Sequence, residues 1–350
     1  MAPTLRIDLS SDTSTKPSEG MRKAMYDAEV GDEQKHEDKT TTTLCERVAT
    51  LLGKEAAVFL PSGIMSNVVA LLTHCAPGDD IICSSDAHII GSEGGGVAIF
   101  GGISITPIDT VLGIYSADEL KARLRPSRSR SPHSRLAHIE QTTNKGGGAI
   151  WSVDQINDVA KVAKDAGLSV HTDGARLMNA VVASGVSAKE FVASCDSAWT
   201  DLSKGLGAPV GSVLTGSKDF IDEAWTWKHR LGGAMRQSGV IAAAGLYALE
   251  HNIERLAEDH ANAQVLAERI ADIPGVKLDP PNVETNLVFF DVSETELSAP
   301  EIASRLLEKG IRMGAINERR MRAVTHLDVS KSDVIAASDA IQEILKNHKA

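Results

Sequence analysis

Short apolar runs recur through the first two thirds of the chain, and most of them are followed by a longer stretch of amphipathic sequence. Short runs bounded by turn residues predict buried strands, whereas apolar positions three or four residues apart predict helices. We predict strands at 56–60, 80–83, 104–108, 136–140, 168–173 and 198–200. Strands that alternate with helices predict an α/β fold, with a mainly parallel central sheet flanked by helices.

The predicted helices lie between these strands and after them. They are expected at 21–26, 44–52, 68–72, 153–166, 188–194 and in the stretch up to Leu249, then from about 251, at 299–309 and at 331–347. A threonine of the Thr40–Thr43 run is expected to cap the second helix. Further strands at 286–291 and 323–324 predict a smaller C-terminal α/β domain. We therefore divide the chain into an N-terminal arm (1–20), a large domain (21–250) and a small domain (251–350).

Composition narrows the class of protein. The formal net charge is −11 over 350 residues, which argues against a nucleic-acid or anionic-membrane partner. The basic segment Arg125–Arg135 has no aromatic residue for base stacking and is expected to be an exposed loop. The four cysteines have no metal-ligand spacing, so we predict reduced thiols, no metal site and a cytoplasmic protein.

The lysine of Asp201-Leu202-Ser203-Lys204-Gly205-Leu206-Gly207 is the first candidate for chemistry. It follows an apolar run and is flanked by small residues, so it is expected on a tight turn at the end of a buried strand. A lone lysine is usually a solvated surface charge. A lysine held in a pocket can instead form a Schiff base with an aldehyde.

A carboxylate at the end of another strand favours the second interpretation. The segment Leu168–Arg176 is a predicted strand that ends in Asp173, with Arg176 close behind. Pyridoxal phosphate (PLP) requires this combination, because a carboxylate keeps the pyridine nitrogen protonated while a lysine carries the aldehyde. Asp173 and Lys204 together therefore predict a PLP site.

With these two motifs, the chain resembles the threonine aldolases, PLP enzymes of the aspartate aminotransferase fold type (fold type I). The resemblance extends from Asp8-Leu9-Ser10-Ser11-Asp12-Thr13 to Arg322-Ala323-Val324-Thr325-His326-Leu327-Asp328. It implies cleavage of L-threonine or L-allo-threonine to glycine and acetaldehyde. It also implies a homodimer or homotetramer whose active sites are shared between subunits.

The resemblance assigns further residues to the cofactor. A strand, a small-residue turn at Ser62-Gly63-Ile64 and a helix form a typical phosphate-binding arrangement, which the family uses for the PLP phosphate. His88 is expected to stack on the PLP ring and is a candidate base, although a histidine beside isoleucines is usually a core residue. Ser203 and Arg236 are also assigned to the cofactor, with Arg236 approaching its phosphate. Arg176 is expected on its phenolate side.

The substrate is expected to be a small amino acid. The resemblance assigns Ser11, Glu93, Arg176 and Arg322 to its binding. The arginines suit its carboxylate, because a planar guanidinium grips a carboxylate with two parallel hydrogen bonds. It also brings the polar segment 31–38, otherwise expected to be a solvated loop, close to the active site of a neighbouring subunit.

Two departures from the family leave the reaction open. Thr143 stands where many relatives have a histidine that contacts the substrate hydroxyl, and Lys35-His36 replace a Tyr-Gly pair. The first change removes an aldol base, and the second adds possible proton donors. Aldol cleavage with His88 as base is favoured, and alanine racemisation, known in fungal members of this family, is the alternative. A catalytically silent PLP-binding relative is a further alternative, against which the retained Lys204 and Asp173 argue.

Overall fold

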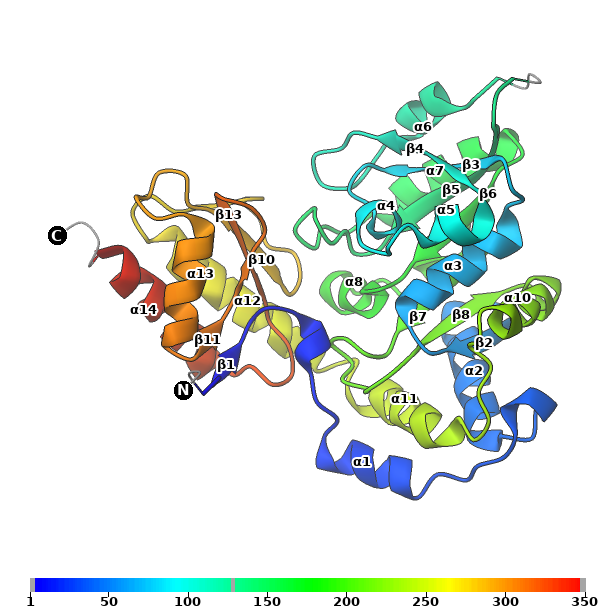
Figure 1. The fold of residues 1–350 in the computed structure, drawn as a ribbon, viewed down its shortest axis with the longest axis horizontal. Helices are drawn as coiled ribbons and strands as arrows, with labels where there is room; N and C mark the ends of the chain where they lie inside the picture. Colours follow the sequence, from blue (N-terminus) through cyan, green and yellow to red (C-terminus); the bar gives the residue numbers. More distant parts are fainter. Residues whose placement is uncertain (1–3, 127–129, 347–350) are drawn as a thin grey trace.

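The computed structural model describes residues 4–126 and 130–346. The chain forms two lobes, a large one built on a seven-stranded sheet and a small one built on a four-stranded sheet (Figure 1). In spatial order, the large sheet contains β2 (Ala56–Leu60), β8 (Ser212–Gly216), β7 (Ser197–Asp201), β6 (Ser169–Asp173), β5 (His133–Glu140), β3 (Asp79–Ser84) and β4 (Ser104–Ile108). The predicted PLP-dependent transferase fold of type I, with its mainly parallel sheet, is confirmed.

One strand of the large sheet was missed by the sequence patterns. β8 runs antiparallel to both of its neighbours, β7 and β2, whereas β7, β6, β5, β3 and β4 are parallel along their pairings. Only Val213 and Leu214 of the five buried residues of β8 are apolar, so this strand lacks the apolar run from which the other strands were predicted. The parallel strands all end at one edge of the sheet, and β6 and β7 end at Asp173 and Asp201.

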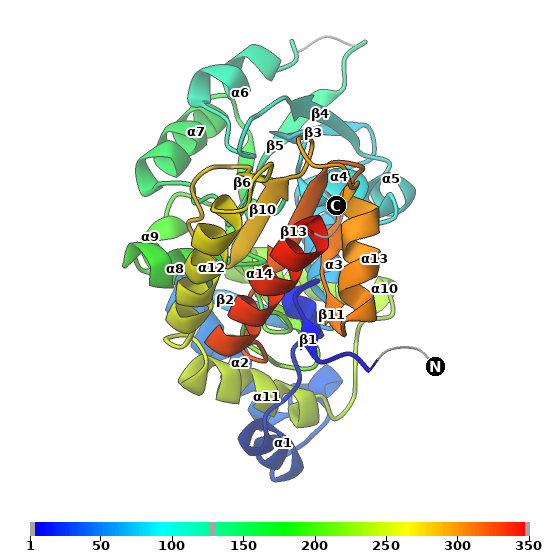
Figure 2. The same ribbon diagram turned by 90° about the vertical axis from the view of Figure 1, so that its left-hand side faces the viewer.

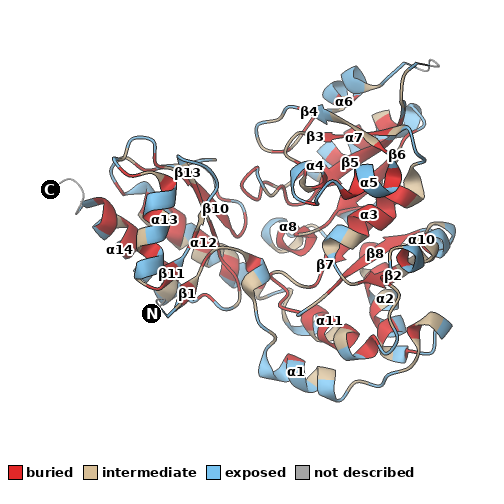
Figure 3. Ribbon diagram, viewed as in Figure 1, coloured by how far each residue is buried: buried red, intermediate tan, exposed pale blue. Residues whose placement is uncertain are grey.

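Helices cover both faces of the large sheet (Figure 3). One face is covered by α3 (Gly63–His74) and α10 (Lys218–Arg230), and α5 (Gly96–Gly101) packs on α3. The other face carries α2 (Lys39–Leu52), α6 (Ala117–Arg123), α7 (Val153–Asp165), α8 (Leu177–Ser184) and α9 (Ala188–Phe191). Outside this layer, α11 (Gly239–His251) packs on α2, and α1 (Glu19–Tyr26) packs on α11. The short helix α4 (His88–Gly91) follows β3. Of these, α4, α5, α6, α8 and α10 had not been predicted.

The small lobe, which faces the viewer in Figure 2, has its own hydrophobic core. Its sheet runs β12 (Gly314–Ala315), β13 (Arg320–Val324), β10 (Leu287–Asp291) and β9 (Lys277–Leu278), and its helices are α12 (Leu256–Ala271), α13 (Ala299–Glu308) and α14 (Lys331–Lys346). β1 (Ile7–Asp8) of the N-terminal arm pairs in parallel with β11 (Ile311–Arg312), so the arm begins inside this lobe. The division of the chain at 20 and 250 stays a prediction.

Two local expectations were wrong. Asp38, not a threonine, caps α2, since its carboxylate accepts from the Thr41 backbone N–H at 2.9 Å. The polar segment 31–38 is not a solvated loop: it contains the 3₁₀ turn Glu33–Lys35, and the Glu33 side chain is buried against Lys228 with an Oε1–Nζ distance of 2.6 Å. A polar segment can be buried when a residue far along the chain supplies an opposite charge, as Lys228 does for Glu33.

The remaining expectations concern loops and cysteines. Part of the basic segment, residues 127–129, lies outside the described residues, and His133 already belongs to β5. All four cysteines are free thiols. Within 4–126 and 130–346, no helix is long and apolar enough to cross a membrane.

Candidate active site

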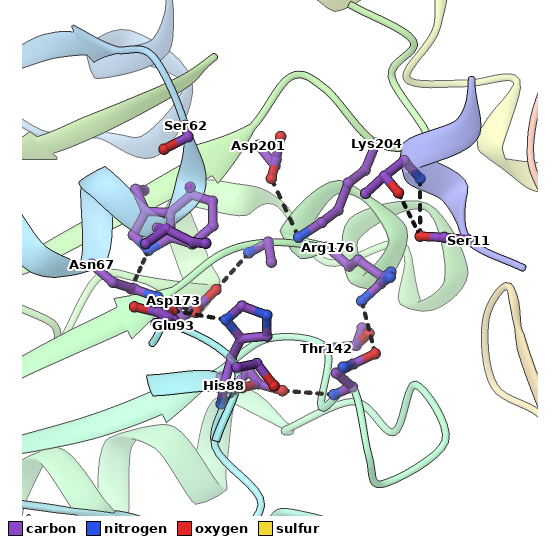
Figure 4. Close-up of a pocket in the computed structure, with 18 of the residues that line it drawn as sticks. Ser11, Ser62, Asn67, His88, Glu93, Thr142, Asp173, Arg176, Asp201 and Lys204 are labelled. Atoms are coloured by element: carbon purple, nitrogen blue, oxygen red, sulfur yellow. Dashed lines mark hydrogen bonds and ion pairs between the residues drawn. The ribbon is translucent and has the colours of Figure 1, made fainter. Parts of the chain in front are cut away.

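A cavity of about 380 Å³ lies where the parallel strands of the large sheet end and the small lobe begins (Figure 4). Residues from the arm, the large lobe and the small lobe line it together. The predicted site residues among them are Ser11, Ser62, Gly63, Ile64, His88, Glu93, Asp173, Arg176, Lys204 and Arg322. Strand ends in an open α/β sheet are the usual place for a ligand.

Lys204 projects into this cavity from the turn after β7. Its Nζ lies 3.3 Å from Asp201 Oδ2, while Asp201 Oδ1 accepts hydrogen bonds from the backbone and hydroxyl of Ser203. Thr15 of the arm donates to the Lys204 carbonyl at 2.9 Å and so anchors the turn. Ser203, predicted to bind the cofactor, is thus directed at Asp201 and is absent from the cavity lining.

Asp173 forms the buried end of the cavity and is 1% exposed. Its Oδ2 accepts from Asn67 Nδ2 at 2.8 Å, and its Oδ1 accepts from the Ala175 backbone at 3.0 Å. A carboxylate fixed in this way can hold a protonated ring nitrogen without moving to meet it.

His88 lies on the wall of the cavity at the start of α4. Its Nδ1 is 2.8 Å from Glu93 Oε1, and its backbone N–H donates to Glu140 Oε2. The hydrogen bond with Glu93 is the largest influence on the pKa of His88 and raises it above its ordinary value of 6.5, while burial opposes the rise. Burial, followed by the charge of Asp173, raises the pKa of Glu140 to about 7.

The N-terminus of α3 supplies the anion-binding end of the cavity. The Ser62 hydroxyl caps the helix by accepting from the Met65 backbone N–H at 3.2 Å. The first turn of a helix presents N–H groups and the positive end of the dipole to an anion. A Cβ on Gly63 would lie 2.6 Å from the Trp199 ring, so only glycine lets the turn approach the sheet this closely.

The two arginines differ in how far they are committed to protein partners. Arg176 Nε and Nη2 grip Asp12 Oδ2 and Oδ1 at 2.7 and 2.8 Å. Burial alone would raise the pKa of Asp12, but the charge and hydrogen bonds of Arg176 outweigh burial and hold this pKa well below its usual range. Arg322 donates from Nη2 to the Ser10 carbonyl at 2.9 Å, and its Nε has no partner within residues 4–126 and 130–346.

Of the two adjacent threonines after β5, the cavity is lined by the one that was not predicted. Thr142 lines the cavity, whereas Thr143, the predicted hydroxyl contact, does not. Thr143 is 2% exposed, and its side chain lies against the backbone turns at Gly113 and Gly146. The predicted contact between Thr143 and the substrate is therefore not supported by the cavity lining.

The residues assigned to a neighbouring subunit lie away from this cavity. His36 packs edge-on against Trp225 at a ring distance of 5.2 Å, Lys35 is exposed, and Arg236 pairs with Asp32 at 3.0 Å. A contact between Lys35, His36 or Arg236 and the active site of another subunit stays a prediction.

Sequence patterns missed several polar residues that shape the cavity, and four of them hold charged groups in place or carry charge themselves. Asn67 and Glu140 line it, Asp201 pairs with Lys204, and Asp12 holds Arg176. Asp12 and Asp201 belong to the motifs from which the family resemblance was drawn, so their position gave a signal. Asn67 ends the small-residue turn before the predicted helix and Glu140 ends a predicted strand, and neither gave a signal beyond being polar.

Several polar atoms at the cavity are buried without a partner in the described part of the chain: Glu93 Oε2, Thr142 Oγ1 and Arg322 Nε. Buried polar groups are normally hydrogen-bonded, so such atoms gathered around one cavity indicate that a polar ligand completes it. Among residues 4–126 and 130–346, no group of three His, Cys, Asp or Glu side chains could hold a metal ion.

Comparison with known proteins agrees with this geometry. The family model described as beta-eliminating lyase matches residues 8–293. Low-specificity L-threonine aldolase 1 of Arabidopsis thaliana is 39% identical over 344 residues, which cover 97% of this chain and 96% of that protein.

Solved structures share the fold at lower identity. A threonine aldolase of Leishmania major superposes with a TM-score of 0.84 at 17% identity, covering 97% of this chain and all (100%) of the other. A structure described as SPT with PLP internal aldimine has a TM-score of 0.76 at 17% identity and covers 97% of this chain and 87% of its own. The chain belongs to the threonine aldolase family, among the proteins grouped as beta-eliminating lyases.

Proposed function

We propose that this chain is a PLP-dependent carbon–carbon lyase that cleaves L-threonine and L-allo-threonine to glycine and acetaldehyde. The observation that carries the proposal is that Lys204 and Asp173, at the ends of adjacent strands, line one cavity together with His88. The Arabidopsis relative named as a low-specificity L-threonine aldolase supports the choice of substrate.

The cavity residues fit PLP. The first turn of α3 suits a phosphate, the buried Asp173 carboxylate suits a protonated pyridine nitrogen, and Lys204 supplies an amine. The SPT neighbour, solved with PLP on the same fold, adds support. When bound, PLP supplies an aldehyde for amine attachment and an electron sink for the bond that breaks at Cα.

His88 is the group best placed to move the substrate proton. A carboxylate only accepts hydrogen bonds, so the proton at Nδ1 points at Glu93 and leaves Nε2 as the acceptor. As the Cα–Cβ bond breaks, Nε2 takes the proton of the β-hydroxyl, and the departing carbon leaves as an aldehyde. Glu93 stabilises the positive charge that His88 acquires.

The remaining groups orient the substrate. Arg322 has an unpartnered Nε at the cavity and suits the substrate carboxylate, with Ser11 beside it. Arg176 is largely occupied by Asp12, so it acts as a fixed positive charge at the cavity wall. The unpartnered Thr142 Oγ1 suits a hydrogen bond with the substrate hydroxyl.

The assembly and the compartment remain proposals. We retain a homodimer or homotetramer in which Lys35, His36 and Arg236 approach a neighbouring site, and a cytoplasmic location. Cross-linking and light scattering would test the assembly: a monomer at micromolar concentration would contradict it.

Incubation of the PLP-loaded protein with L-threonine, and with L-alanine in deuterated water, tests the reaction. We expect acetaldehyde and glycine from threonine and no D-alanine. D-alanine without acetaldehyde would establish the racemase alternative and overturn the proposal. Lys204→Ala should abolish both turnover and the visible absorbance of the bound cofactor.

A further inference from the structure

Asn67 lies at the centre of a hydrogen-bond network behind the cavity. It belongs to α3, one turn after the anion-binding N-terminus, and it is 1% exposed. Its side chain bonds to three residues on three other segments: Trp199 Nε1 at 2.7 Å, Asp173 Oδ2 at 2.8 Å and Glu93 Oε1 at 2.7 Å. Figure 4 shows Asn67 between Asp173 and the phosphate-binding turn.

The direction of the Asn67 amide is set by Trp199. An indole N–H can only donate, so the amide atom that faces it is Oδ1. Nδ2 then faces the two carboxylates, and its two hydrogens go to Asp173 and Glu93. Both hydrogens are thus committed, and the opposite orientation of the amide would place an oxygen against both carboxylates.

This arrangement separates two buried carboxylates by a shared donor. Without it, Asp173 and Glu93 would face each other across the space that Asn67 fills, and like charges in a buried site repel strongly. Glu93 Oε1 accepts from Asn67 and from His88 Nδ1, so the same amide also fixes the carboxylate that orients His88.

We propose that Asn67 is a positioning residue for the reaction, whose amide fixes Asp173 and the Glu93–His88 pair relative to each other while Trp199 sets the direction of that amide. This inference deepens the proposed function and rests on it for the role of His88. Strand β7 then has two roles, because it leads into the turn with Lys204 and also holds Trp199, which orients the Asn67 amide.

Three substitutions test the proposal, with the dissociation constant for PLP of the apo-protein as the first measurement. Asn67→Leu removes both donors at similar volume and should weaken PLP binding and kcat/KM about 10- to 100-fold at every pH, because both partner carboxylates lose their orientation. Trp199→Phe keeps Asn67 but frees its amide to rotate. It should also raise the PLP dissociation constant and lower kcat/KM, but by a smaller factor of about threefold to tenfold.

Asn67→Asp gives a signature that a merely structural role lacks. The introduced carboxyl can donate one hydrogen bond only when protonated, so PLP binding should be weak near pH 8.5 and recover as the pH falls toward 6. The charged and titratable groups around it are Asp173 and Glu93 in direct contact, His88 and Glu140 behind Glu93, and Asp201, Lys204 and Arg176 elsewhere on the cavity wall. The unsubstituted protein measured over the same range corrects for these groups.

Ser66→Ala is the matched control. Ser66 precedes Asn67 on α3, is fully buried and bonds to Ser212 at 2.7 Å, but it is absent from the cavity lining. Its loss should leave the PLP dissociation constant within about twofold of the original.

The outcomes separate this inference from the proposed function. Unchanged PLP binding in Asn67→Leu, a flat pH response in Asn67→Asp, or an equal loss in Ser66→Ala would overturn the positioning role. If Asn67→Leu does not fold, Asn67→Asp and Trp199→Phe decide the same question. If the protein binds PLP but releases no acetaldehyde from threonine, the proposed function fails while the PLP measurements still decide the role of Asn67.

Discussion

Two ion pairs are fully buried among the residues that the structure describes, and their surroundings differ. Glu33 and Lys228 lie outside the cavity, and both Glu33 oxygens are occupied, by Lys228 and the Met235 backbone at Oε1 and by Ser238 at Oε2. Arg176 lines the cavity and is held by Asp12, and Arg322 Nε at the same cavity has no partner among the described residues. The first pair is complete and ties segment 31–38 to α10. The second belongs to a network that a ligand would complete.

The largest expected effect follows from breaking the complete pair. Glu33→Ala leaves the Lys228 ammonium buried without its counter-charge, which costs about 3–5 kcal/mol of unfolding free energy. Chemical denaturation would measure the loss. Lys161→Ala breaks a fully exposed pair with Asp165 and should leave the denaturation curve where it is. A curve for Glu33→Ala that coincides with that of Lys161→Ala would contradict the comparison.

The pair at the cavity should affect catalysis more than stability. Asp12→Asn keeps the shape of the side chain but removes the charge that Arg176 grips, so Arg176 can turn toward the ligand. We expect kcat/KM for threonine to fall about 100-fold, which is about 2.7 kcal/mol, with a smaller loss of unfolding free energy than in Glu33→Ala. Steady-state kinetics and denaturation on the same sample compare the two. A loss of unfolding free energy without a loss of kcat/KM would show that the Asp12–Arg176 pair only stabilises the fold, as the Glu33–Lys228 pair does.

A smaller effect should separate the adjacent threonines. Thr142→Val removes a hydroxyl that lines the cavity, and kcat/KM should fall about tenfold, the value of one good hydrogen bond. Thr143→Val removes a hydroxyl directed away from the cavity and should leave kcat/KM near its original value. The reverse order of effects would restore the assignment of Thr143 to the substrate.

The smallest effect concerns pH. Because Glu93 raises the pKa of His88 above 6.5, kcat/KM should rise with pH through this higher pKa as His88 becomes a free base. The stability from the pair is fully present below 6.5 and is lost as the pH passes the raised pKa. Glu93→Gln removes the largest cause of the rise, so the acidic limb of the rate profile should move to lower pH. An unmoved limb would exclude Glu93 from this role.

The sequence predicted those parts of the molecule that depend on neighbours in the chain. The bounds of β2 and β4 were predicted as the structure has them, and Lys204, Asp173 and His88 follow strands whose ends converge in any parallel sheet. The burial of Glu33 depends on a lysine 195 positions away, which no local pattern records. That Thr142 and not Thr143 lines the cavity depends on how the backbone turns after β5. The sequence could not distinguish them, because the two residues have the same side chain.

The N-terminal arm gives the two lobes a second covalent link. β1 lies in the small lobe, the chain enters the large lobe between β1 and α1, and it returns to the small lobe between α11 and α12. With two connections, the lobes can rotate relative to each other only about the line that joins the connections. A single linker would allow rotation about any axis. A version of the protein cut within residues 9–18 would therefore keep every strand of the large sheet and still lose one of the two connections that hold Arg322 and Lys204 at the same cavity.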